Sequence, residues 1–356
     1  MKILFAGAFQ YWVYEEACAR ALERFGVSVE RFSWSAYFSG IVGRAQSKHV
    51  FYGPAMYRLN RDLLARAVAY RPDALFVWRG THILPRTLRA IRERTGAVLV
   101  SYNNDDPFGP QAHGNVPFHH RWLWKYYLKA VPDYDLHLVF RELNVPEIKA
   151  AGAREAQVLL PYFVPEIHHP VTLTPEERVK YGCEAVFVGH YEPDDRVACL
   201  QALVDAGVRV KLFGGTTWTP QVLGPLAQYF GKVEAVLGLE YAKALCGAQM
   251  CLCFISKLNR DTYTTRCFEI PACGRLMLSE RTADLPRLFQ EDQEAVYFSS
   301  PAELVRRALW LREHPDRLEE IALAGYRRVL ADNHSVEGRM QQVLEILEHR
   351  LKSRQR

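Results

Sequence analysis

Apolar strands alternate with amphipathic helices twice along this chain, and a proline-rich stretch separates the two runs. Continuous apolar segments such as KILFA (2–6) and EAVFV (184–188) are typical of strands covered on both faces of a parallel sheet. The stretch LPYFVPEIHHPVTLTP (160–175) contains four prolines and breaks the alternation, as a linker does. The pattern therefore predicts an α/β protein with two Rossmann-like, doubly wound domains that face each other across a cleft.

The domain boundaries follow from the positions of these runs, since 356 residues exceed what one ordinary core accommodates. We expect the C-terminal helix to pack back on the N-terminal domain, and we expect a long glycine-containing loop over residues 40–53. The predicted segments are an N-terminal Rossmann-like domain (1–163), a linker (164–182), a C-terminal Rossmann-like domain (183–335), and a helix with a basic tail (336–356). The predicted strands cover residues 2–6, 27–32, 73–78, 97–102, 135–140, 156–161, 184–189, 208–214, 248–255, 275–279 and 295–299.

Composition limits the cellular setting that we expect. No apolar run reaches the roughly 18 residues that span a bilayer, and MKILFAGAF suits a first strand better than a secretory signal. The eight cysteines form no CxxC pair or other metal-binding spacing, which indicates reduced and mostly buried thiols. These features predict a cytoplasmic protein without a bound metal.

Positive charge gathers in the first half of the chain. Residues 1–165 carry 21 lysines and arginines against 14 aspartates and glutamates, whereas residues 166–356 carry 24 against 26. Surface arginines explain this bias, but so does an anionic partner such as a membrane surface or an acidic substrate. No recognition motif for nucleic acid accompanies the charge.

The segment FHHRWLWKYYLK (118–129) mixes charge with aromatic rings. On a helix, Arg121, Lys125 and Lys129 would form one stripe, with Phe118 and Trp122 between them. A buried amphipathic helix explains the apolar arc. The alternatives are a peripheral membrane contact and a platform on which an acceptor sugar stacks.

Several common catalytic motifs are missing from the sequence. A dinucleotide-binding GxGxxG after the first strand would need glycines where Phe9 and Trp12 stand. The chain also has no GxxxxGK[ST], GxSxG or HExxH sequence. These absences argue against a dehydrogenase with the usual fingerprint, a P-loop nucleotidase, a serine hydrolase of the elbow type and a zincin.

The stretch NRDTYTTRCFEIPACG (259–274) concentrates both charge signs directly after a predicted strand. Thr265 is a favourable N-cap, so we expect a helix that begins there and ends at Gly274. A helix N-terminus with Arg260 and Arg266 suits phosphate oxygens. Glu269 lies on the same helix face and suits sugar hydroxyls. The combination predicts a site for a nucleoside diphosphate and its ribose, with ordinary surface ion pairs as the alternative.

The same stretch carries a family resemblance. NRDTYTTRCFEIPACGRLMLSERTADLPRLF, together with the upstream VFVGHYEPDDR and LEYAKALCGAQMCLCF, resembles the CgeB-like (spore maturation protein type) glycosyltransferases. The resemblance covers about residues 184–347 and extends more loosely to SYNNDDPFG in the first half. It implies the GT-B fold, with the second domain binding a nucleotide-sugar donor and the first domain taking the acceptor.

The resemblance also implies roles for single residues. Many retaining GT-B enzymes carry an E-x7-E acid pair, and here Asp261 and Glu269 occupy those positions. Glu269 would bind the ribose, while Asp261 would lie near the donor sugar. The cations that would neutralise the diphosphate without a metal are Lys257, Arg260 and Arg266, and the remaining donor contacts expected in this stretch are Asn259 and Thr265.

Turns after other strands supply further candidates. We expect Gly189 and His190, which follow EAVFV, and Gly214 in FGG to contact the donor, although simple turns explain them as well. Gly7 would allow a close approach of the donor diphosphate after the first strand.

The segment SYNNDDPFGPQAHG (101–114) follows a strand of the first domain. Asp105, Asp106 or His113 could remove the proton of an acceptor hydroxyl as a general base. The alternative is a plain turn, because Asp106 precedes Pro107.

Together these features predict a metal-independent glycosyltransferase. It would move a sugar from a UDP, GDP or dTDP sugar to a glycan, protein or lipid-linked acceptor, and the acid spacing suggests retention of configuration. The alternatives are a sugar-nucleotide epimerase of GT-B type and a non-catalytic subunit that binds sugar nucleotides. The sequence predicts no tightly bound cofactor.

Overall fold

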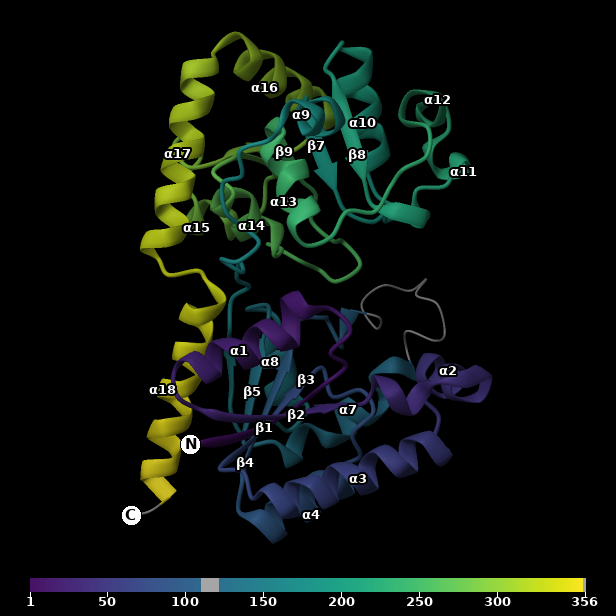
Figure 1. Cartoon of the computed structure of the whole chain (residues 1–356), viewed down its shortest axis with the longest axis vertical. Coiled ribbons are helices and arrows are strands. Elements are labelled where there is room, and N and C mark those ends of the chain that lie inside the picture. The colour runs from purple at the N-terminus through teal and green to yellow at the C-terminus, as the bar shows by residue number, and fades with distance from the viewer. Residues whose placement is uncertain (110–121, 355–356) are drawn as a thin grey trace. The chain divides into compact units, whose positions relative to one another are not determined.

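The computed structural model describes residues 1–109 and 122–354 of the chain (Figure 1). The chain forms two compact units. Unit 1 comprises Met1–Pro161, Leu258–Arg260 and Val336–Arg356, and unit 2 comprises Tyr162–Lys257 and Asp261–Ser335. The short segment Leu258–Arg260 thus groups with unit 1, although its neighbours in sequence belong to unit 2.

Unit 1 is built on a parallel sheet of six strands in the order β2-β1-β3-β4-β5-β6. The order reverses between β1 and β3, because the chain first adds β2 on one side of β1 and then continues on the other. The strands are β1 (Lys2–Gly7), β2 (Ser28–Ser33), β3 (Ala74–Trp78), β4 (Val98–Asn103), β5 (Leu136–Val139) and β6 (Ala156–Val158).

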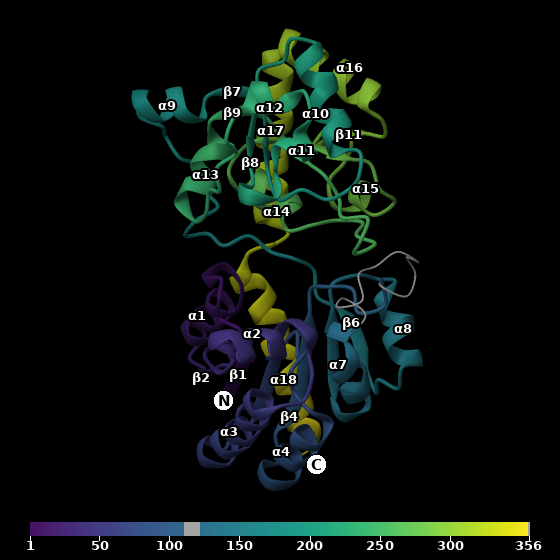
Figure 2. The same ribbon diagram turned by 90° about the vertical axis from the view of Figure 1, so that its right-hand side faces the viewer.

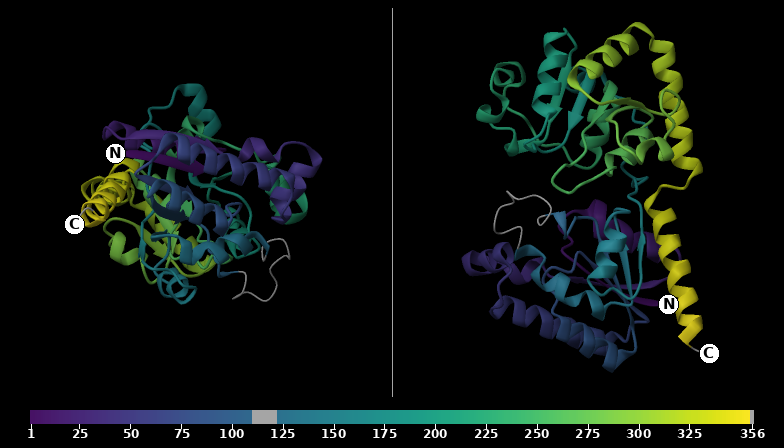
Figure 3. Two further views of the ribbon diagram at one scale, coloured as in Figure 1. Left: turned by 90° about the horizontal axis from the view of Figure 1, so that it is seen from below. Right: turned by 180° about the vertical axis from the view of Figure 1, so that it is seen from behind.

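Helices cover both faces of this sheet. On one face, α3 (Pro54–Tyr70) and α4 (Pro85–Thr95) pack side by side on the buried cluster that includes Leu4, Leu75 and Leu99 (Figures 1 and 2). Elsewhere α18 (Val336–Arg354), yellow in Figure 3, packs against α1 (Ala17–Arg24). The C-terminal helix therefore packs on the N-terminal unit, as expected.

The remaining helical elements of unit 1 are shorter. They are η1 (Trp12–Glu16), η2 (Ser35–Phe38), α2 (Gly40–His49), α7 (Lys125–Ala130), η3 (Val131–Asp133) and α8 (Asn144–Ala150).

Unit 2 contains a second parallel sheet, of five strands in the order β11-β10-β9-β7-β8. The order reverses between β7 and β9. The strands are β7 (Cys183–Val188), β8 (Val210–Phe213), β9 (Ala248–Cys253), β10 (Leu276–Glu280) and β11 (Val296–Phe298). The prediction of two parallel, doubly wound sheets is confirmed.

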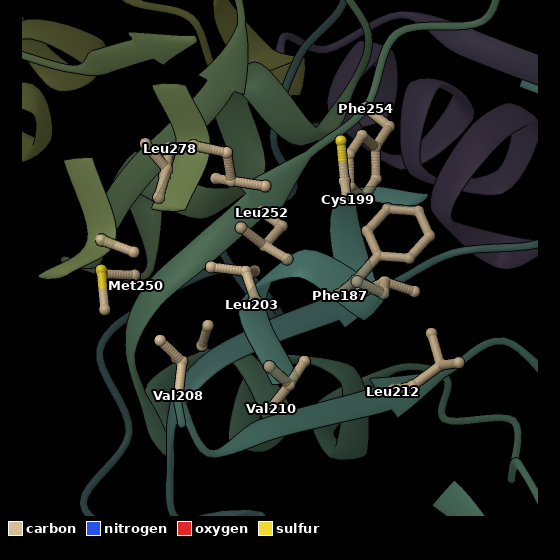
Figure 4. Packing of buried hydrophobic residues seen from close by; sticks show 14 of the residues in the cluster. Phe187, Cys199, Leu203, Val208, Val210, Leu212, Met250, Leu252, Phe254 and Leu278 are labelled. Atoms are coloured by element: carbon tan, nitrogen blue, oxygen red, sulfur yellow. The ribbon is translucent and has the colours of Figure 1, made fainter. Parts of the chain in front are cut away.

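The core of unit 2 joins one face of this sheet to two helices. Phe187, Met250, Leu252 and Leu278 of the sheet pack against Leu203 of α10 (Arg196–Asp205), as Figure 4 shows. Helix α16 (Pro301–Glu313) lies beside α10 and closes the same cluster. The other helical elements are α9 (Pro175–Tyr181), η4 (Gly215–Thr217), α11 (Pro220–Leu223), α12 (Leu226–Phe230), α13 (Leu239–Cys246), α14 (Arg266–Ala272), α15 (Leu285–Leu288) and α17 (Pro315–Ala331).

Two local expectations were wrong. Residues 40–49 form α2 where a loop was expected. The helix needs a glycine at position 43, because an added Cβ would lie 2.6 Å from the Phe38 carbonyl carbon. The stretch 160–175 was expected to be only a linker, but a helix begins at its last residue, Pro175. A capping box between Thr174 and Glu177 starts that helix.

All eight cysteines are buried free thiols, as the missing CxxC spacing indicated. Within residues 1–109 and 122–354, no helix combines the length and the low polarity that crossing a membrane requires.

The packing of α18 generates a first prediction. Replacing the fully buried Leu347 with alanine should lower the free energy of unfolding of unit 1 by about 2–5 kcal/mol, because a core leucine loses its contacts and leaves a cavity. Hydrogen exchange should become faster in α1, which packs on α18, while α16 of unit 2 keeps its protection. Glu348→Ala changes an exposed neighbour and serves as the control. Unchanged protection of α1 in the Leu347 variant would contradict this packing.

Candidate functional site

The carboxyl edge of the unit 2 sheet gathers most of the residues predicted to bind a donor. Gly189 follows β7, Gly214 follows β8, and the stretch 255–269 follows β9. Because the strand order reverses between β7 and β9, loops from these neighbouring strands diverge there and leave room for a ligand.

The turns after β7 and β8 touch each other through their two glycines. A Cβ added to Gly214 would lie 2.5 Å from Trp218 Nε1 and closer still to the Gly189 carbonyl oxygen. The Trp218 Nε1–H donates a hydrogen bond to that carbonyl at 2.7 Å. Gly214 is therefore required by close packing of the two turns.

Arg266, the first residue of α14, reaches across to the end of β7. Its Nε donates to the Val188 carbonyl at 2.9 Å, and its guanidinium lies 5.5 Å from the centre of the Phe187 ring. A Cβ at Gly189 would lie 2.6 Å from Arg266 Nη2, so Gly189 makes room for this side chain. Two candidates that the sequence placed 77 residues apart thus lie in contact.

Glu269 is held by two aromatic residues that the sequence analysis missed. The Tyr241 hydroxyl donates a hydrogen bond of 2.6 Å to Glu269 Oε2, and His168 Nε2 lies 3.9 Å from Oε1. His168 Nδ1 accepts the Val164 N–H at 2.9 Å, so in the neutral ring the proton resides on Nε2, facing the carboxylate. Burial lowers the pKa of His168, which keeps the ring neutral near pH 7.

The loop after β9 is tied to loops from neighbouring strands. The Ser256 hydroxyl donates to Glu192 Oε2 at 2.8 Å, and Glu192 Oε1 lies 3.1 Å from His190 Nε2. The exposed Lys257 pairs with Glu280, the last residue of β10, at 3.2 Å. His190 and Lys257 therefore lie at this edge of the sheet with acidic partners.

Helix α14 has Thr265 at its N-cap position, as expected, but without the expected side-chain bond. The helix begins at Arg266 and ends at Ala272, and the Thr265 side chain makes no capping hydrogen bond. The Thr265 carbonyl instead accepts the N–H groups of Phe268 and Glu269, at 2.9 and 3.0 Å. Backbone carbonyls thus satisfy these donors, so the predicted helix start is confirmed but its side-chain cap is not. Asn259 and Asp261 flank Arg260 in the same loop, where the Asp261 N–H donates to the Ser256 carbonyl.

Arg260 makes its contacts inside unit 1. Its Nε and Nη2 donate to the two oxygens of Asp106 at 2.6 and 3.0 Å, and its guanidinium also pairs with Glu147 at 2.8 Å. Burial acts to raise the pKa of Asp106, but the hydrogen bonds from Arg260 and the Phe108 N–H hold it below its usual value. A buried carboxylate that already accepts these bonds is a poor proton acceptor. The same pairing engages the Arg260 guanidinium that was expected at a phosphate.

Asp105 has a different environment from Asp106. Its carboxylate pairs with Arg79 Nε at 2.6 Å and lines a cavity of about 530 Å³ in unit 1. Gly7 lies near the same cavity, where the side chain of Glu15 fills the space beside it: an added Cβ would meet Glu15 Cγ at 2.7 Å. His113 lies outside the described residues, as do Phe118 and Arg121.

The described part of the segment 118–129 forms a mostly packed helix end. Tyr127 is fully buried and Trp124 is almost so, whereas Lys125 Nζ lies 4.4 Å from the centre of the half-exposed Trp122 ring. This arrangement matches the amphipathic-helix interpretation for residues 122–130.

Tyr241 and His168 could not be assigned from local spacing. Both stand in segments that the sequence analysis quoted, but nothing in either segment indicates which distant carboxylate it contacts. Within residues 1–109 and 122–354, no group of three or more histidine, cysteine, aspartate or glutamate side chains could hold a metal ion.

Comparison with known proteins places this geometry in a wider context. A protein-family profile described as glycosyl transferase-like matches residues 196–345, about two fifths of the chain. This region contains Tyr241, Arg266 and Glu269. No curated protein sequence matches the chain.

Solved structures match nearly the whole chain. Sucrose-phosphate synthase from Thermosynechococcus elongatus has a TM-score of 0.71 at 11% identity, covering 99% of this chain and 100% of that one. Anabaena HepE in complex with UDP-glucose has a TM-score of 0.66 at 14% identity, covering 98% and 100%. A Listeria monocytogenes protein provisionally assigned as UDP-N-acetylglucosamine 2-epimerase has a TM-score of 0.60 at 11% identity, covering 99% and 97%. With its two parallel Rossmann-like sheets, the chain has the fold of the GT-B glycosyltransferases.

Proposed function

We propose that this protein is a glycosyltransferase that uses a nucleoside diphosphate sugar as donor. Unit 2 would bind the donor at the switch between β7 and β9. The observation that carries the proposal is the pairing of Arg266 beside Gly189 with a Glu269 carboxylate held by neutral groups. The glycosyl transferase-like profile covers both Arg266 and Glu269, which supports the same conclusion.

Glu269 suits the ribose of the donor. Tyr241 occupies one position on Oε2, and the carboxylate retains further lone pairs that can accept hydrogen bonds from sugar hydroxyls. Neither Tyr241 nor the neutral His168 cancels its negative charge. An ionised acceptor makes stronger hydrogen bonds than a neutral one, so this carboxylate can bind vicinal hydroxyls firmly.

Arg266 and Lys257 suit the diphosphate. The Val188 carbonyl and the Phe187 ring already position the Arg266 guanidinium, so it loses little further conformational entropy when it binds phosphate oxygens. Negative charge grows on the diphosphate as it leaves, and fixed cations would stabilise that charge in the transition state without a metal. Because Arg260 is held by Asp106 and Glu147, the proposal depends mainly on Arg266. Lys257 is the second cation; it is exposed and would exchange its partner Glu280 for the diphosphate.

The acceptor would enter the cavity of unit 1. Asp105 lines this cavity beside Arg79, with which it pairs, and it is the predicted carboxylate that would deprotonate or orient an acceptor hydroxyl. Asp261 keeps its proposed place near the donor sugar. HepE, whose structure holds UDP-glucose, supports testing UDP sugars first.

A sugar-nucleotide epimerase is the second candidate, because a provisionally assigned epimerase shares the fold. Thermal shifts with UDP, GDP and dTDP identify the nucleotide, since a ligand at about 100 times its Kd adds roughly 2.7 kcal/mol of stability. Donor turnover then separates the candidates. A transferase releases the nucleoside diphosphate faster when an acceptor is added, whereas an epimerase converts the sugar without needing one. Binding without any turnover would indicate a non-catalytic subunit.

Glu269→Ala should weaken nucleotide binding in a folded protein. Loss of a charged hydrogen bond to the ribose should cost about 1.5–3 kcal/mol, or roughly 10- to 150-fold in Kd. Titration calorimetry with the identified nucleotide measures this, and Glu320→Ala, an exposed carboxylate of α17, is the control. Equal affinity of the Glu269 variant and the parent protein would disprove the donor-site assignment.

Tyr241→Phe should weaken nucleotide binding only while Glu269 is present. The change removes the 2.6 Å hydrogen bond that orients the carboxylate and should cost about 0.5–1.5 kcal/mol. In the Glu269→Ala background the same change should cost close to nothing, because the pair acts through one contact. Additive losses in this double-mutant cycle would show that Tyr241 acts independently of Glu269.

Asp105→Asn should lower kcat by about 10²- to 10⁴-fold and leave nucleotide affinity unchanged, because a general base acts only in the chemical step. Asp106→Asn should instead lower the stability of unit 1, since it removes the charged partner of Arg260. Single-turnover kinetics and thermal unfolding of both variants measure the contrast. Near-normal turnover by folded Asp105→Asn would exclude it as the base.

A further inference from the structure

The cavity of unit 1 lies where the strand order of its sheet reverses. Its lining includes Ala8 after β1, Ser35 after β2, Arg79 after β3 and Asn104 after β4. A volume of about 530 Å³ falls in the range of small-molecule sites. The carboxyl edge of a parallel sheet, at its switch point, is also where open α/β sheets bind ligands.

Aromatic rings form one wall of this cavity. The ring of Tyr14 stacks on Trp78 with centres 6.0 Å apart and planes inclined by 26°, and Trp34 and Phe38 line the same space. Trp78 is held in turn by an edge contact to Tyr102 at 4.5 Å. Rigid, flat and partly polar rings of this kind suit the mixed apolar and hydroxylated surface of a sugar.

Besides the aromatic wall, the cavity has a positively charged part, because α2 supplies two cations. Arg44 and Lys48 are four residues apart, lie on one face of the helix, and both line the cavity. Among residues 1–109 and 122–354, neither has a carboxylate within ion-pair distance. The stretch 110–121 contains no aspartate or glutamate that could supply one.

The other charged groups of the cavity have partners of their own. Arg79 and Asp105 neutralise each other at 2.6 Å. The Glu15 carboxylate accepts the Ala8 and Phe9 N–H groups at 2.9 and 3.3 Å, and burial raises its pKa. Burial lowers the pKa of His82 to about 4, so its ring is neutral near pH 7.

We propose that this cavity binds an anionic sugar as the acceptor, with the ring against Tyr14 and Trp78 and a phosphate or carboxylate group on Arg44 and Lys48. The inference rests on the proposed glycosyltransferase function and names the class of its acceptor. Both kinds of anion use the same two cations, so binding experiments must separate sugar phosphates from uronic acids.

Saturation-transfer NMR and calorimetry on the full chain provide the test. The probes are glucose, mannose and fructose 6-phosphates, glucuronate, galacturonate, and the corresponding neutral sugars. We expect at least one anionic sugar to bind ten-fold or more tightly than its neutral parent. The double variant Arg44→Ala/Lys48→Ala should lose at least ten-fold of that affinity and keep the nucleotide affinity of unit 2.

A matched control removes two positive charges elsewhere in unit 1. Arg58→Ala/Arg94→Ala changes exposed arginines of α3 and α4 that do not line the cavity, so it should leave sugar binding intact. An equal loss in this control would mean that general charge, and not the cavity, attracts the ligand, which overturns the proposal.

Three other results would also overturn it: no binding of any anionic sugar, equal binding of neutral sugars, or binding of inorganic phosphate or a nucleotide at Arg44 and Lys48 in place of sugars. Failure of the proposed function is distinguishable from these, because it appears as absent nucleotide-sugar binding or turnover at unit 2. If only the sugar phosphates bind, the anionic group is a phosphate; if only the uronates bind, it is a carboxylate.

Discussion

Close contact between two turns determines what the carboxyl edge of unit 2 can hold. The turns after β7 and β8 meet at Gly189 and Gly214, where neither position has room for a Cβ. The missing Cβ of Gly189 also leaves room for Arg266 to extend along the end of β7 to the Val188 carbonyl. The guanidinium is thereby fixed at the point where the strand order reverses. The location of a cation at the switch point thus depends on backbone packing before any ligand is present.

Glu269 and Asp106 have different hydrogen-bond partners, and this difference explains why only Glu269 suits a ligand. Asp106 is fully buried and receives a charged guanidinium and an amide, so its charge is cancelled inside the protein. Glu269 receives a tyrosine hydroxyl and faces a neutral imidazole. Neutral donors orient a carboxylate without removing its charge, which leaves it able to accept further hydrogen bonds. The kind of partner, more than the degree of burial, separates a structural carboxylate from a binding one.

The strands were predictable because both faces of a parallel sheet are covered, which requires continuous apolar runs such as KILFA and EAVFV. Helix α2 was not predictable, because glycines in a sequence usually indicate a loop. Gly43 is there for another reason: the helix passes too close to Phe38 for any larger residue. At the site, local spacing brought Arg266 and Glu269 together. Tyr241 and His168 reach Glu269 through tertiary packing, and Arg260 contacts a residue 154 positions away. No local pattern encodes such pairings.

The positive charge of the first half of the chain can be interpreted only when each cation is checked for a carboxylate partner. Many arginines of this half are matched by carboxylates: Arg31 bridges Glu16 and Glu23, and Arg92 pairs with Asp135. A cation whose charge is already balanced in this way is a weak site for an anionic partner. Arg44 and Lys48 differ because they line a cavity and have no described carboxylate within reach. A count of charges therefore indicates an anionic partner only in general, whereas cations without a carboxylate partner among the described residues give the proposed anion a specific place to bind.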